Sequence, residues 1–253
     1  MLEAGEITIS VVIPCYNCES TIYRAVQSIF LSKKLPCEIL LYDDCSDDGT
    51  RDLLKKISKE FDTVTVFFSD VNKGAGYARN FLIDISCGDY IAFLDADDRW
   101  LPGKLDETVA VIQAENADII TSFYDIEDEV SRKVGSRSLP TKINLLRMHL
   151  SNWLPMSMTV VRSCLIGVNE MPLIRRRQDY AFWLNIFKKN ANLKCHVIAE
   201  PLGVYTRRKD SLSSSPLTNL KCNYEMFRKA IGYNALVSAF LVSINSLFRI
   251  FRV

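Results

Sequence analysis

The sequence predicts an α/β fold in which a mainly parallel sheet carries helices on both faces. Apolar segments rich in β-branched residues alternate with segments of helical periodicity between residues 7 and 98, a pattern typical of parallel strands joined by helices. Polar residues follow each of these strands at its carboxyl end, where ligands bind in such sheets. The 253 residues are 48% hydrophobic and 24% charged, so the chain can bury a sizeable core.

Composition narrows the classes of partner. A formal net charge of +1 provides no overall basic field for nucleic acid. The first six residues are acidic and lack the basic start and apolar middle of a signal peptide, so we expect a cytoplasmic protein. Only Cys15 and Cys18 of the eight cysteines are closely spaced, which is poor evidence for zinc. We expect reduced thiols that act as small core residues.

The first two strands are predicted at residues 7–13 and 38–42. Pro14 is expected to end the first strand, because proline has a fixed φ and no backbone N–H. A helix over residues 20–31 connects the two strands. Thr50 is expected to cap the helix that follows the second strand, since a threonine hydroxyl can accept a hydrogen bond from a free helical N–H.

A third strand is predicted at residues 64–68, followed by a glycine-broken loop at residues 72–76 and a helix at residues 77–85. Five apolar residues, 90–94, form the fourth strand, since the run is too short for a helix. Further elements are expected along the rest of the chain. They are a helix that starts near residues 100–102 and carries Leu105, Val109 and Ile112, a strand at 118–123, a hairpin or mobile loop at 125–140, a short helix at 143–150, a strand at 156–161, a helix after Asp179, and strands at 195–198 and 202–205.

The residues that follow the first four strands are expected to converge at one edge of the sheet. They are Pro14, Tyr16 and Asn17; Asp43 and Asp44; Lys73 and Arg79; and Asp95 and Asp97. An aromatic ring, two acids, a pair of cations and an acid cluster would suit a base, a ribose, a diphosphate and its metal. Carboxylates crowded at a strand end favour a hard divalent cation such as Mg²⁺, which completes its shell with substrate phosphates. The alternative is a solvated turn with spare acid.

The C-terminal segment is predicted to form an amphipathic helix. Apolar residues recur every three or four positions between Leu236 and Phe251, while Ser243, Asn245 and Arg249 lie elsewhere on the helical wheel. Polar residues interrupt the run too often for a membrane span. The pattern fits a helix lying in a membrane interface and equally a helix packed on its own domain or on a partner.

Five blocks of sequence, in this order, resemble the family 2 glycosyltransferases, particularly those that assemble bacterial surface polysaccharides. The blocks are Val11–Asn17, Tyr42–Thr50, Asn72–Asn80, Phe93–Asp98 and Arg177–Leu184. The resemblance implies an inverting enzyme with the GT-A fold over residues 1–213. Within that domain, residues 1–98 would bind the nucleotide and residues 99–213 the acceptor. The apolar pattern of residues 214–253 predicts a helical tail that can associate with a membrane.

The resemblance also implies roles for individual residues. Pro14, Tyr16 and Asn17 would line the nucleotide pocket, and Asp44, with Asp43 nearby, would bind uracil or ribose. Arg79 would approach the base or the phosphates, and Asp95 the ribose or a metal-bound water, with Ala96 beside it. Asp97 would ligate Mn²⁺ or Mg²⁺, and Asp179 would be the catalytic base. The expected substrates are a nucleotide-sugar, with UDP favoured, and a saccharide or lipid-linked acceptor in lipopolysaccharide, O-antigen or capsule synthesis.

Two positions depart from the family pattern. Gln178 stands where a glutamate often precedes the catalytic aspartate. Arg207, Arg208 and Lys209 occupy the region where many members have a histidine, so three cations would hold the diphosphate directly.

Other functions remain open from the residues alone. Residues 94–97 are similar to the Asp-x-Asp motif of haloacid dehalogenase-type phosphatases, although Arg99 stands where that class has threonine or valine. A non-catalytic scaffold that binds a nucleotide-sugar is the second alternative. Each site residue also has a structural interpretation: the paired Asp43 and Asp44 as a capping turn, Arg79 as a surface residue, and Asp179 as an acid at a helix N-terminus.

Overall fold

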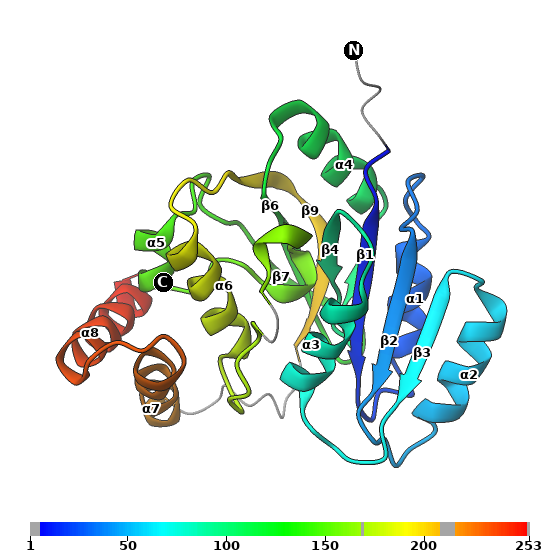
Figure 1. The fold of residues 1–253 in the computed structure, drawn as a ribbon, viewed down its shortest axis with the longest axis horizontal. Coiled ribbons are helices and arrows are strands. Elements are labelled where there is room, and N and C mark those ends of the chain that lie inside the picture. The colour runs from blue at the N-terminus through cyan, green and yellow to red at the C-terminus, as the bar shows by residue number, and fades with distance from the viewer. Residues whose placement is uncertain (1–5, 168–169, 208–215, 252–253) are drawn as a thin grey trace.

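A nine-stranded sheet forms the frame of the computed structural model, which describes residues 6–167, 170–207 and 216–251 (Figure 1). The strands are β1 (Ile9–Cys15), β2 (Glu38–Asp43), β3 (Val64–Phe68), β4 (Tyr90–Phe93), β5 (Arg99–Trp100), β6 (Ile119–Asp128), β7 (Lys133–Arg137), β8 (Val160–Arg162) and β9 (Cys195–Arg207). The α-helices are α1 (Ile22–Ile29), α2 (Thr50–Glu60), α3 (Ala75–Ile85), α4 (Lys104–Glu115), α5 (Leu145–Leu150), α6 (Gln178–Lys189), α7 (Pro216–Glu225) and α8 (Ala235–Phe251). Three short helical turns complete the set: η1 (Met156–Met158), η2 (Ser163–Leu165) and the π-helical η3 (Met226–Ala230).

The strand order is β3-β2-β1-β4-β8-β6-β9-β5, with β7 paired to β6. The sheet is parallel from β3 to β4, because β1 pairs in parallel with both β2 and β4, and β2 with β3. Beyond β4 it is mixed: β8 is antiparallel to β4 and β6, whereas β9 is parallel to β6. The carboxyl ends of β1, β2, β3 and β4 therefore lie at one edge, as the sequence predicts.

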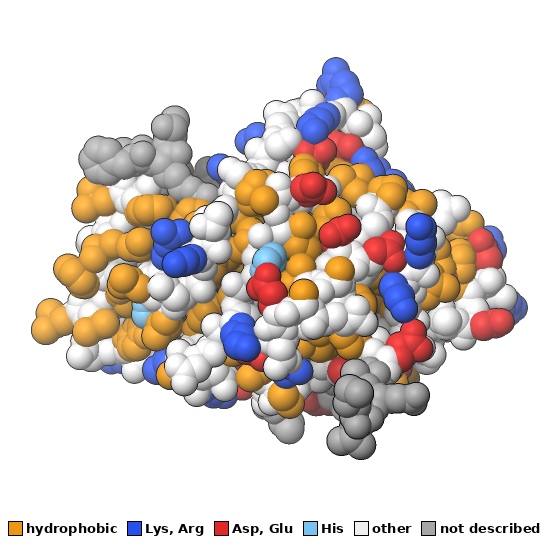
Figure 2. Space-filling view, turned by 90° about the horizontal axis from the view of Figure 1, so that it is seen from above, with side chains coloured by type: hydrophobic (Ala, Val, Ile, Leu, Met, Phe, Trp, Pro, Cys, Tyr) orange, Lys and Arg blue, Asp and Glu red, His pale blue; other side chains and the backbone are white. Residues whose placement is uncertain are grey.

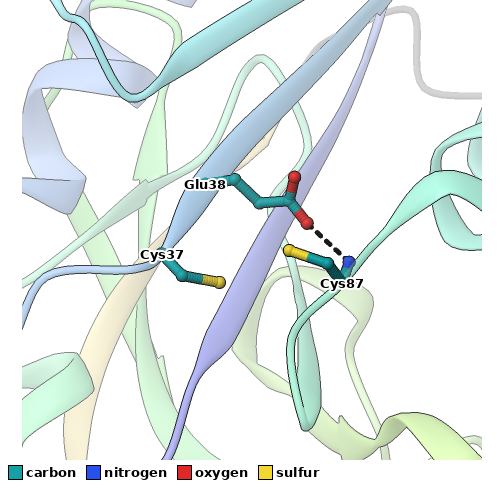
Figure 3. A group of neighbouring side chains, drawn as sticks. All are labelled: Cys37, Glu38 and Cys87. Atoms are coloured by element: carbon teal, nitrogen blue, oxygen red, sulfur yellow. Dashed lines mark hydrogen bonds between the residues drawn. The ribbon is translucent and has the colours of Figure 1, made fainter.

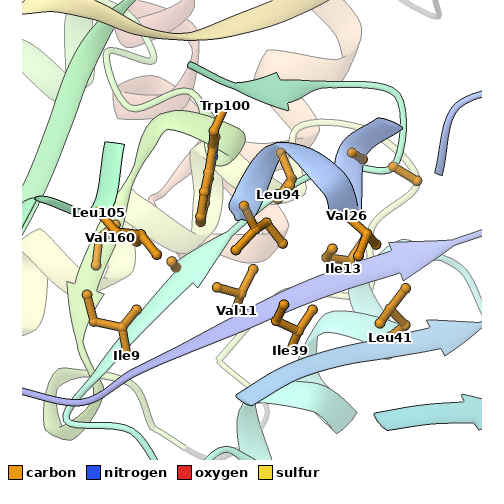
Figure 4. Close-up of a cluster of buried hydrophobic side chains, with 14 of the residues drawn as sticks. Ile9, Val11, Ile13, Val26, Ile39, Leu41, Leu94, Trp100, Leu105 and Val160 are labelled. Atoms are coloured by element: carbon orange, nitrogen blue, oxygen red, sulfur yellow. The ribbon is translucent and has the colours of Figure 1, made fainter. Parts of the chain in front are cut away.

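Helices cover both faces of the sheet, which confirms the predicted layers (Figure 1). Successive residues of a strand point to opposite faces, and β1 divides its side chains in this way. Val11 and Ile13 pack in a core cluster with α1, α2 and α4, part of which is drawn in Figure 4. Val12 packs in a second cluster with α3 and α6.

Pro14 does not end the first strand, contrary to expectation. It pairs with Tyr42 of β2, and the strand continues to Cys15. On its other side β1 pairs with β4 only as far as Val12, so no partner requires an N–H from Pro14 there.

Thr50 also differs from its predicted role. It is the first residue of α2, and its side chain makes no cap to that helix. Its hydroxyl instead accepts a hydrogen bond from the backbone N–H of Cys18 at 2.8 Å, while Asp48 Oδ1 accepts from the Thr50 N–H at 2.9 Å. The residue thus joins the loops that follow β1 and β2.

Two strand predictions beyond residue 150 need correction. The segment 156–161 begins as the helical turn η1 and becomes strand only at Val160. The segments 195–198 and 202–205 are one long strand, β9, whose register against β6 shifts near Phe123. The uncertain segment 125–140 forms a hairpin, since β6 and β7 pair antiparallel.

All eight cysteines are free, in agreement with the expectation of reduced thiols. Their expected place in the core holds for only two of them. Cys15 and Cys18 are buried, whereas Cys37, Cys87 and Cys164 are exposed.

Helix α8 packs a polar residue inward and leaves apolar residues outside. Asn245 is 2% exposed, and its amide donates to the backbone oxygen of Leu150 at 2.8 Å and to the Tyr180 hydroxyl at 3.1 Å. Leu236 and Phe240 are 84% and 63% exposed. Figure 2 shows hydrophobic side chains gathered at the end of the molecule where α8 lies. No helix among the described residues has the length and apolarity needed to cross a bilayer.

Phe93 offers a test of how the sheet is joined to α6. It is 1% exposed, and its ring meets those of Phe182 and Trp183 at centroid distances of 5.7 and 5.8 Å. We expect Phe93→Ala to lower the free energy of unfolding by about 3–5 kcal/mol, because the cavity left behind cannot fully collapse. Chemical denaturation measures the loss. The matched control, Phe240→Ala at an exposed phenylalanine, should change it by less than about 0.5 kcal/mol, and equal losses in the two variants would contradict this account.

Candidate active site

Two adjoining pockets open at the edge where the parallel strands end. The smaller has a volume of about 190 Å³ and the larger about 930 Å³. Arg79 and Asp95 line both, so this pair forms their shared wall. The smaller pocket brings together most of the predicted nucleotide-binding residues. They are Pro14, Tyr16, Asp44, Arg79, Asp95, Ala96 and Asp97.

Asp44 organises the loop between β3 and α3. Its two carboxylate oxygens accept hydrogen bonds from the backbone N–H groups of Lys73 and Gly74, at 2.8 and 2.7 Å. Gly74 adopts a φ of 88°, a backbone conformation that residues with a Cβ rarely adopt. Asp44 therefore lines the smaller pocket and also fixes the start of α3, the helix that carries Arg79.

Three predicted residues lie near the smaller pocket without being part of its lining. Asp43 is fully buried, and its Oδ2 lies 3.3 Å from Arg51 Nε. The side-chain oxygen of Asn17 accepts from the Asp47 N–H at 3.1 Å. Lys73 directs its ammonium group to Tyr77, 3.2 Å from the hydroxyl. These contacts favour a supporting role for Asp43 and Asn17 and a backbone contribution from Lys73.

The shared wall is an ion pair between α3 and the loop after β4. Arg79 Nη2 lies 2.5 Å from Asp95 Oδ1, with side-chain exposures of 10% and 32%. A charged pair with so little solvent around the guanidinium is screened less than one on the surface. It sets the position of Asp95 relative to α3.

Asp98, which the sequence analysis leaves out of the site, anchors the same loop. Its carboxylate accepts from Ser157 Oγ at 2.5 Å and from the Thr206 N–H at 2.9 Å. Burial raises the pKa of Asp98 well above its usual range, and the charges of Asp97 and Asp95 raise this pKa further. Its adjacency to two other acids was the sequence signal that could have identified it.

The turn η1 forms a floor beneath this loop. Ser157 Oγ accepts from the backbone N–H of Asp95 at 3.1 Å, and the Ser157 carbonyl accepts from Trp100 Nε1 at 2.7 Å. Lys104 Nζ donates to the Met158 carbonyl at 2.7 Å. Burial lowers the pKa of Lys104 to about 7, so this amine donates a hydrogen bond in a site that disfavours its charge.

Asp95 and Asp97 are the residues that could hold a divalent cation. Both are partly exposed and line the smaller pocket, and their charges are close enough to disturb Asp98. Among the described residues no third acidic, histidine or cysteine ligand completes a cluster with them. The arrangement fits Mg²⁺ or Mn²⁺, because such ions use one or two carboxylates and complete their shell with phosphate oxygens and water.

Asp179 lies in the larger pocket, in the first turn of α6. Asn152 Nδ2 donates to its Oδ2 at 2.7 Å. Burial raises the pKa of Asp179, whereas a backbone hydrogen bond from Tyr180 and the charges of Arg79 and Arg177 oppose the rise. A carboxylate with a raised pKa at a cavity wall is suited to accept a proton.

Of the two departures from the family pattern, only Gln178 is adjacent to Asp179 among the described residues. Gln178 does not replace a second acid in function, since its amide donates to the Ile174 carbonyl at 2.5 Å. Arg207 is an exposed residue at the end of β9 and does not line either pocket. Arg208 and Lys209 lie outside the described residues.

The larger pocket contains residues that sequence reasoning did not find. The most notable come from the segment around η1 and from the tail: Asn152, Ser157, Asn223 and Asn245. No motif or periodicity marks these positions, because they reach the pocket from separate elements. Asn245 belongs to α8, so the tail contributes to the wall of the pocket.

A separate cluster of potential metal ligands lies at the opposite, amino end of the strands (Figure 3). Glu38 Oε1 accepts from Ser10 Oγ at 2.6 Å and from the Cys87 N–H at 2.7 Å. The same carboxylate raises the pKa of Cys87 to about 11, which disfavours the thiolate that a metal requires. Cys37, Glu38 and Cys87 are therefore best explained as structural.

The contact between Asn152 and Asp179 can be tested directly. We expect Asn152→Ala to raise the pKa of Asp179 further, because the lost hydrogen bond stabilises the charged carboxylate. Carbon NMR of the side-chain carboxyl groups measures this titration. Asn190→Ala, at the other end of α6, is the control and should leave the pKa unchanged. A pKa of Asp179 that falls or stays constant in Asn152→Ala would contradict the assignment.

Comparisons with known proteins identify the family. The family model described as "Glycosyl transferase family 2" matches residues 10–175. The chain is 30% identical over 244 residues to the UDP-Glc:alpha-D-GlcNAc-diphosphoundecaprenol beta-1,3-glucosyltransferase WfaP of Escherichia coli, covering 95% of this chain and 94% of WfaP. It is 28% identical over 220 residues to WfgD of Escherichia coli, which carries the same description, covering 86% and 84% of the two chains.

The fold matches as well. The crystal structure of residues 1–349 of S. aureus TarS in complex with UDP-GlcNAc superposes with a TM-score of 0.74 at 20% identity, covering 96% of this chain and 72% of that one. These matches do not support the phosphatase alternative. The chain belongs to glycosyl transferase family 2 and is a glycosyltransferase with the GT-A fold.

Proposed function

We propose that this glycosyltransferase moves a sugar from a UDP-sugar, with inversion, to a hydroxyl of a saccharide or lipid-linked acceptor in cell-surface polysaccharide synthesis. The observation that carries the proposal is the placement of Asp179. It lies in the larger pocket, on the other side of the Arg79–Asp95 pair from the nucleotide residues. One base and one adjoining donor pocket favour a single displacement, since the other two acids of the described lining, Asp95 and Asp98, are held by Arg79 and by Ser157 and Thr206.

The donor nucleotide is assigned to the smaller pocket. Tyr16 is 50% exposed and offers a ring face for a base, and Asp44 offers carboxylate oxygens at the pocket wall. Arg79 would meet the diphosphate from α3. UDP is favoured because WfaP and WfgD are described as acting with UDP-Glc and TarS was solved with UDP-GlcNAc.

Asp95 and Asp97 are proposed to hold Mn²⁺ or Mg²⁺ against the diphosphate. When bound, such an ion stabilises the negative charge that collects on the leaving phosphate oxygens. The protein contributes the two carboxylates and holds their loop through Asp98, Ser157 and Thr206. A lining of fixed polar groups needs little reorganisation during the reaction.

Asp179 is proposed to act as the general base. Its carboxylate takes the proton of the acceptor hydroxyl while that oxygen forms a bond to the anomeric carbon. The bond between the anomeric carbon and the diphosphate oxygen breaks, and its electron pair leaves with UDP. Asn152 keeps the Asp179 carboxylate oriented through its 2.7 Å hydrogen bond.

The two halves of the chain are proposed to divide this work. Residues 1–98 would bind the donor, residues 99–213 would bind the acceptor, and residues 214–253 would bring the enzyme to the inner face of the cell membrane. The exposed side chains of α8, Leu236, Val237, Phe240 and Leu247, support this last point, because apolar groups on a surface helix favour a membrane interface.

The proposal is tested first at the two acids. Asp179→Asn should keep UDP binding and lose sugar transfer by at least about 100-fold, since the amide cannot accept the proton. Asp97→Asn should instead weaken the metal-dependent part of UDP binding. Calorimetry with UDP and Mn²⁺ and a screen of UDP-sugars for hydrolysis and transfer provide the measurements. Unchanged transfer in Asp179→Asn would remove the base, and binding without any turnover of a UDP-sugar would favour a scaffold.

The membrane contact is tested at the exposed face of α8. We expect the double variant Phe240→Ser/Leu247→Ser to bind phosphatidylglycerol vesicles at least about tenfold more weakly than the unmodified chain. Two apolar side chains that would move from water into the membrane interface are lost. Vesicle sedimentation gives the bound fraction. Val130→Ser/Val134→Ser, at exposed positions of the β6–β7 hairpin, is the matched control. If both double variants bind as the unmodified chain does, α8 is not the contact.

A further inference from the structure

One face of α3 contacts the segment that leads into α6, the helix of Asp179. Gly76 and Asn80 are four residues apart in α3, so both lie on this face. Asn80 contacts Met171, at the beginning of the segment, and Gly76 lies against Gln178, at its end. Neither Gly76 nor Asn80 belongs to the described lining of either pocket, and the proposed chemistry uses neither of them.

The amide of Asn80 pairs with the backbone of Met171 in both directions. Asn80 Nδ2 donates to the Met171 carbonyl at 2.9 Å, and the Met171 N–H donates to Asn80 Oδ1 at 2.9 Å. Both residues are buried, with exposed fractions of 4% and 1%. A buried N–H and a buried carbonyl need partners, and a side-chain amide offers a donor and an acceptor side by side. This pair therefore fixes the chain at Met171 to α3.

Gly76 allows the same helix to approach the other end of the segment closely. A Cβ at this position would lie 3.1 Å from Gln178 Nε2 and 3.2 Å from the Pro172 carbonyl oxygen, which is tighter than an ordinary van der Waals contact. The Gln178 amide is held in turn by the Ile174 carbonyl, to which it donates. Gly76 therefore sets how near α3 lies to the first turn of α6, where Asp179 follows Gln178.

The entry into α6 has a backbone conformation that needs support. Arg177, the residue before α6, adopts a φ of 66° and a ψ of 22°, in the left-handed region that residues with a Cβ rarely adopt. Such a conformation persists where the surrounding contacts determine it. The contacts of Gly76 and Asn80 with the segment supply part of this support, and the hydrogen bond from Arg177 to Asn219 Oδ1 at 3.0 Å supplies another part.

Helix α3 also influences Asp179 directly. Burial raises the pKa of Asp179, and the charge of Arg79, the neighbour of Asn80 in α3, is among the groups that oppose this rise. The start of the same helix is held by Asp44 through two backbone N–H groups. One helix therefore borders the smaller pocket through Arg79 and supports the segment that carries Asp179.

We propose that Asn80 is a positioning residue for Asp179 and that Gly76 acts with it. The two residues hold segment 171–178 against α3 and so place the Asp179 carboxylate relative to the smaller pocket. They act through the backbone and take no part in the bond changes. The inference rests on the proposed function, because it takes Asp179 as the base.

Asn80→Ala and Gly76→Ala test the proposal in the full chain. We expect each variant to lower kcat for hydrolysis or transfer of a UDP-sugar about tenfold or more, because a displaced base no longer meets the acceptor hydroxyl correctly. The affinity for UDP with Mn²⁺, measured by calorimetry, should change by less than about twofold. Carbon NMR should show the pKa of Asp179 falling towards its ordinary value, since the displaced first turn of α6 is less buried.

Leu54→Ala, in α2, is the control for lost stability. Leu54 is fully buried in the core cluster on the other face of the sheet. Its variant should lower the denaturation midpoint and leave both kcat and the pKa of Asp179 unchanged. Alanine is favoured over glycine within a helix, so Gly76→Ala does not weaken α3 itself and carries the test if Asn80→Ala fails to fold.

Three results would overturn the proposal. The first is an unchanged kcat or an unchanged pKa of Asp179 in Asn80→Ala and Gly76→Ala. The second is a loss of kcat in Leu54→Ala as large as theirs, which would indicate lost stability. The third is a loss of UDP affinity that matches the loss of kcat, which would assign the effect to the donor. Failure of the proposed function looks different, since the unmodified chain would then turn over no UDP-sugar, while the titration of Asp179 would still report its place.

Discussion

Three carboxylates within four residues of one another, Asp95, Asp97 and Asp98, impose the constraint on which the site depends. Without compensation they would repel each other and disorder the loop after β4. The repulsion is offset differently at each carboxylate. Asp95 pairs with the Arg79 guanidinium, and Asp98 accepts hydrogen bonds from Ser157 and Thr206. Asp97 stays partly exposed to solvent at the smaller pocket. The compensating groups come from α3, η1 and β9, so charge balance also fixes how these elements meet.

A second constraint, which is apolar, relates the loop after β4 to Asp179, the proposed base. Phe93 is the last residue of β4, and its ring packs on Phe182 and Trp183 of α6, the helix that carries Asp179 in its first turn. The acid cluster and Asp179 therefore extend from two elements that are joined through buried contacts of Phe93 with two aromatic rings. Close packing of this kind resists small displacements, which is what a reaction between two bound substrates requires.

The first four strands could be predicted from sequence because the pattern of each strand and helix depends on residues that are close together in the chain. Alternating strand and helix patterns imply parallel pairing, and parallel pairing places Tyr16, Asp44, Arg79 and Asp97 at one edge whatever the detailed packing. The lining of the larger pocket was harder to predict from the sequence. Asn152 reaches Asp179 across 27 residues, and Asn245 reaches Tyr180 across 65, with no periodicity that relates them.

The burial of Asn245 beside the core-facing apolar residues of α8 could not be predicted for a related reason. A helical wheel predicts that apolar residues face the domain and polar residues face solvent. Here the polar Asn245 is buried, and its amide donates to the Leu150 carbonyl and the Tyr180 hydroxyl. Thr50 shows the same effect on a smaller scale, since a tertiary partner, Cys18, competes with the local cap. Propensity describes the isolated segment, and tertiary hydrogen bonds decided the outcome.

The place of Asn245 in the pocket wall also bears on how the enzyme could be shortened. A truncation before α8 would remove a hydrogen-bonding partner of Tyr180, the residue next to Asp179, and would open one side of the larger pocket to water. Helix α8 and the elements around Asp179 therefore form one packed unit, and surface substitutions would disturb this unit less than a truncation.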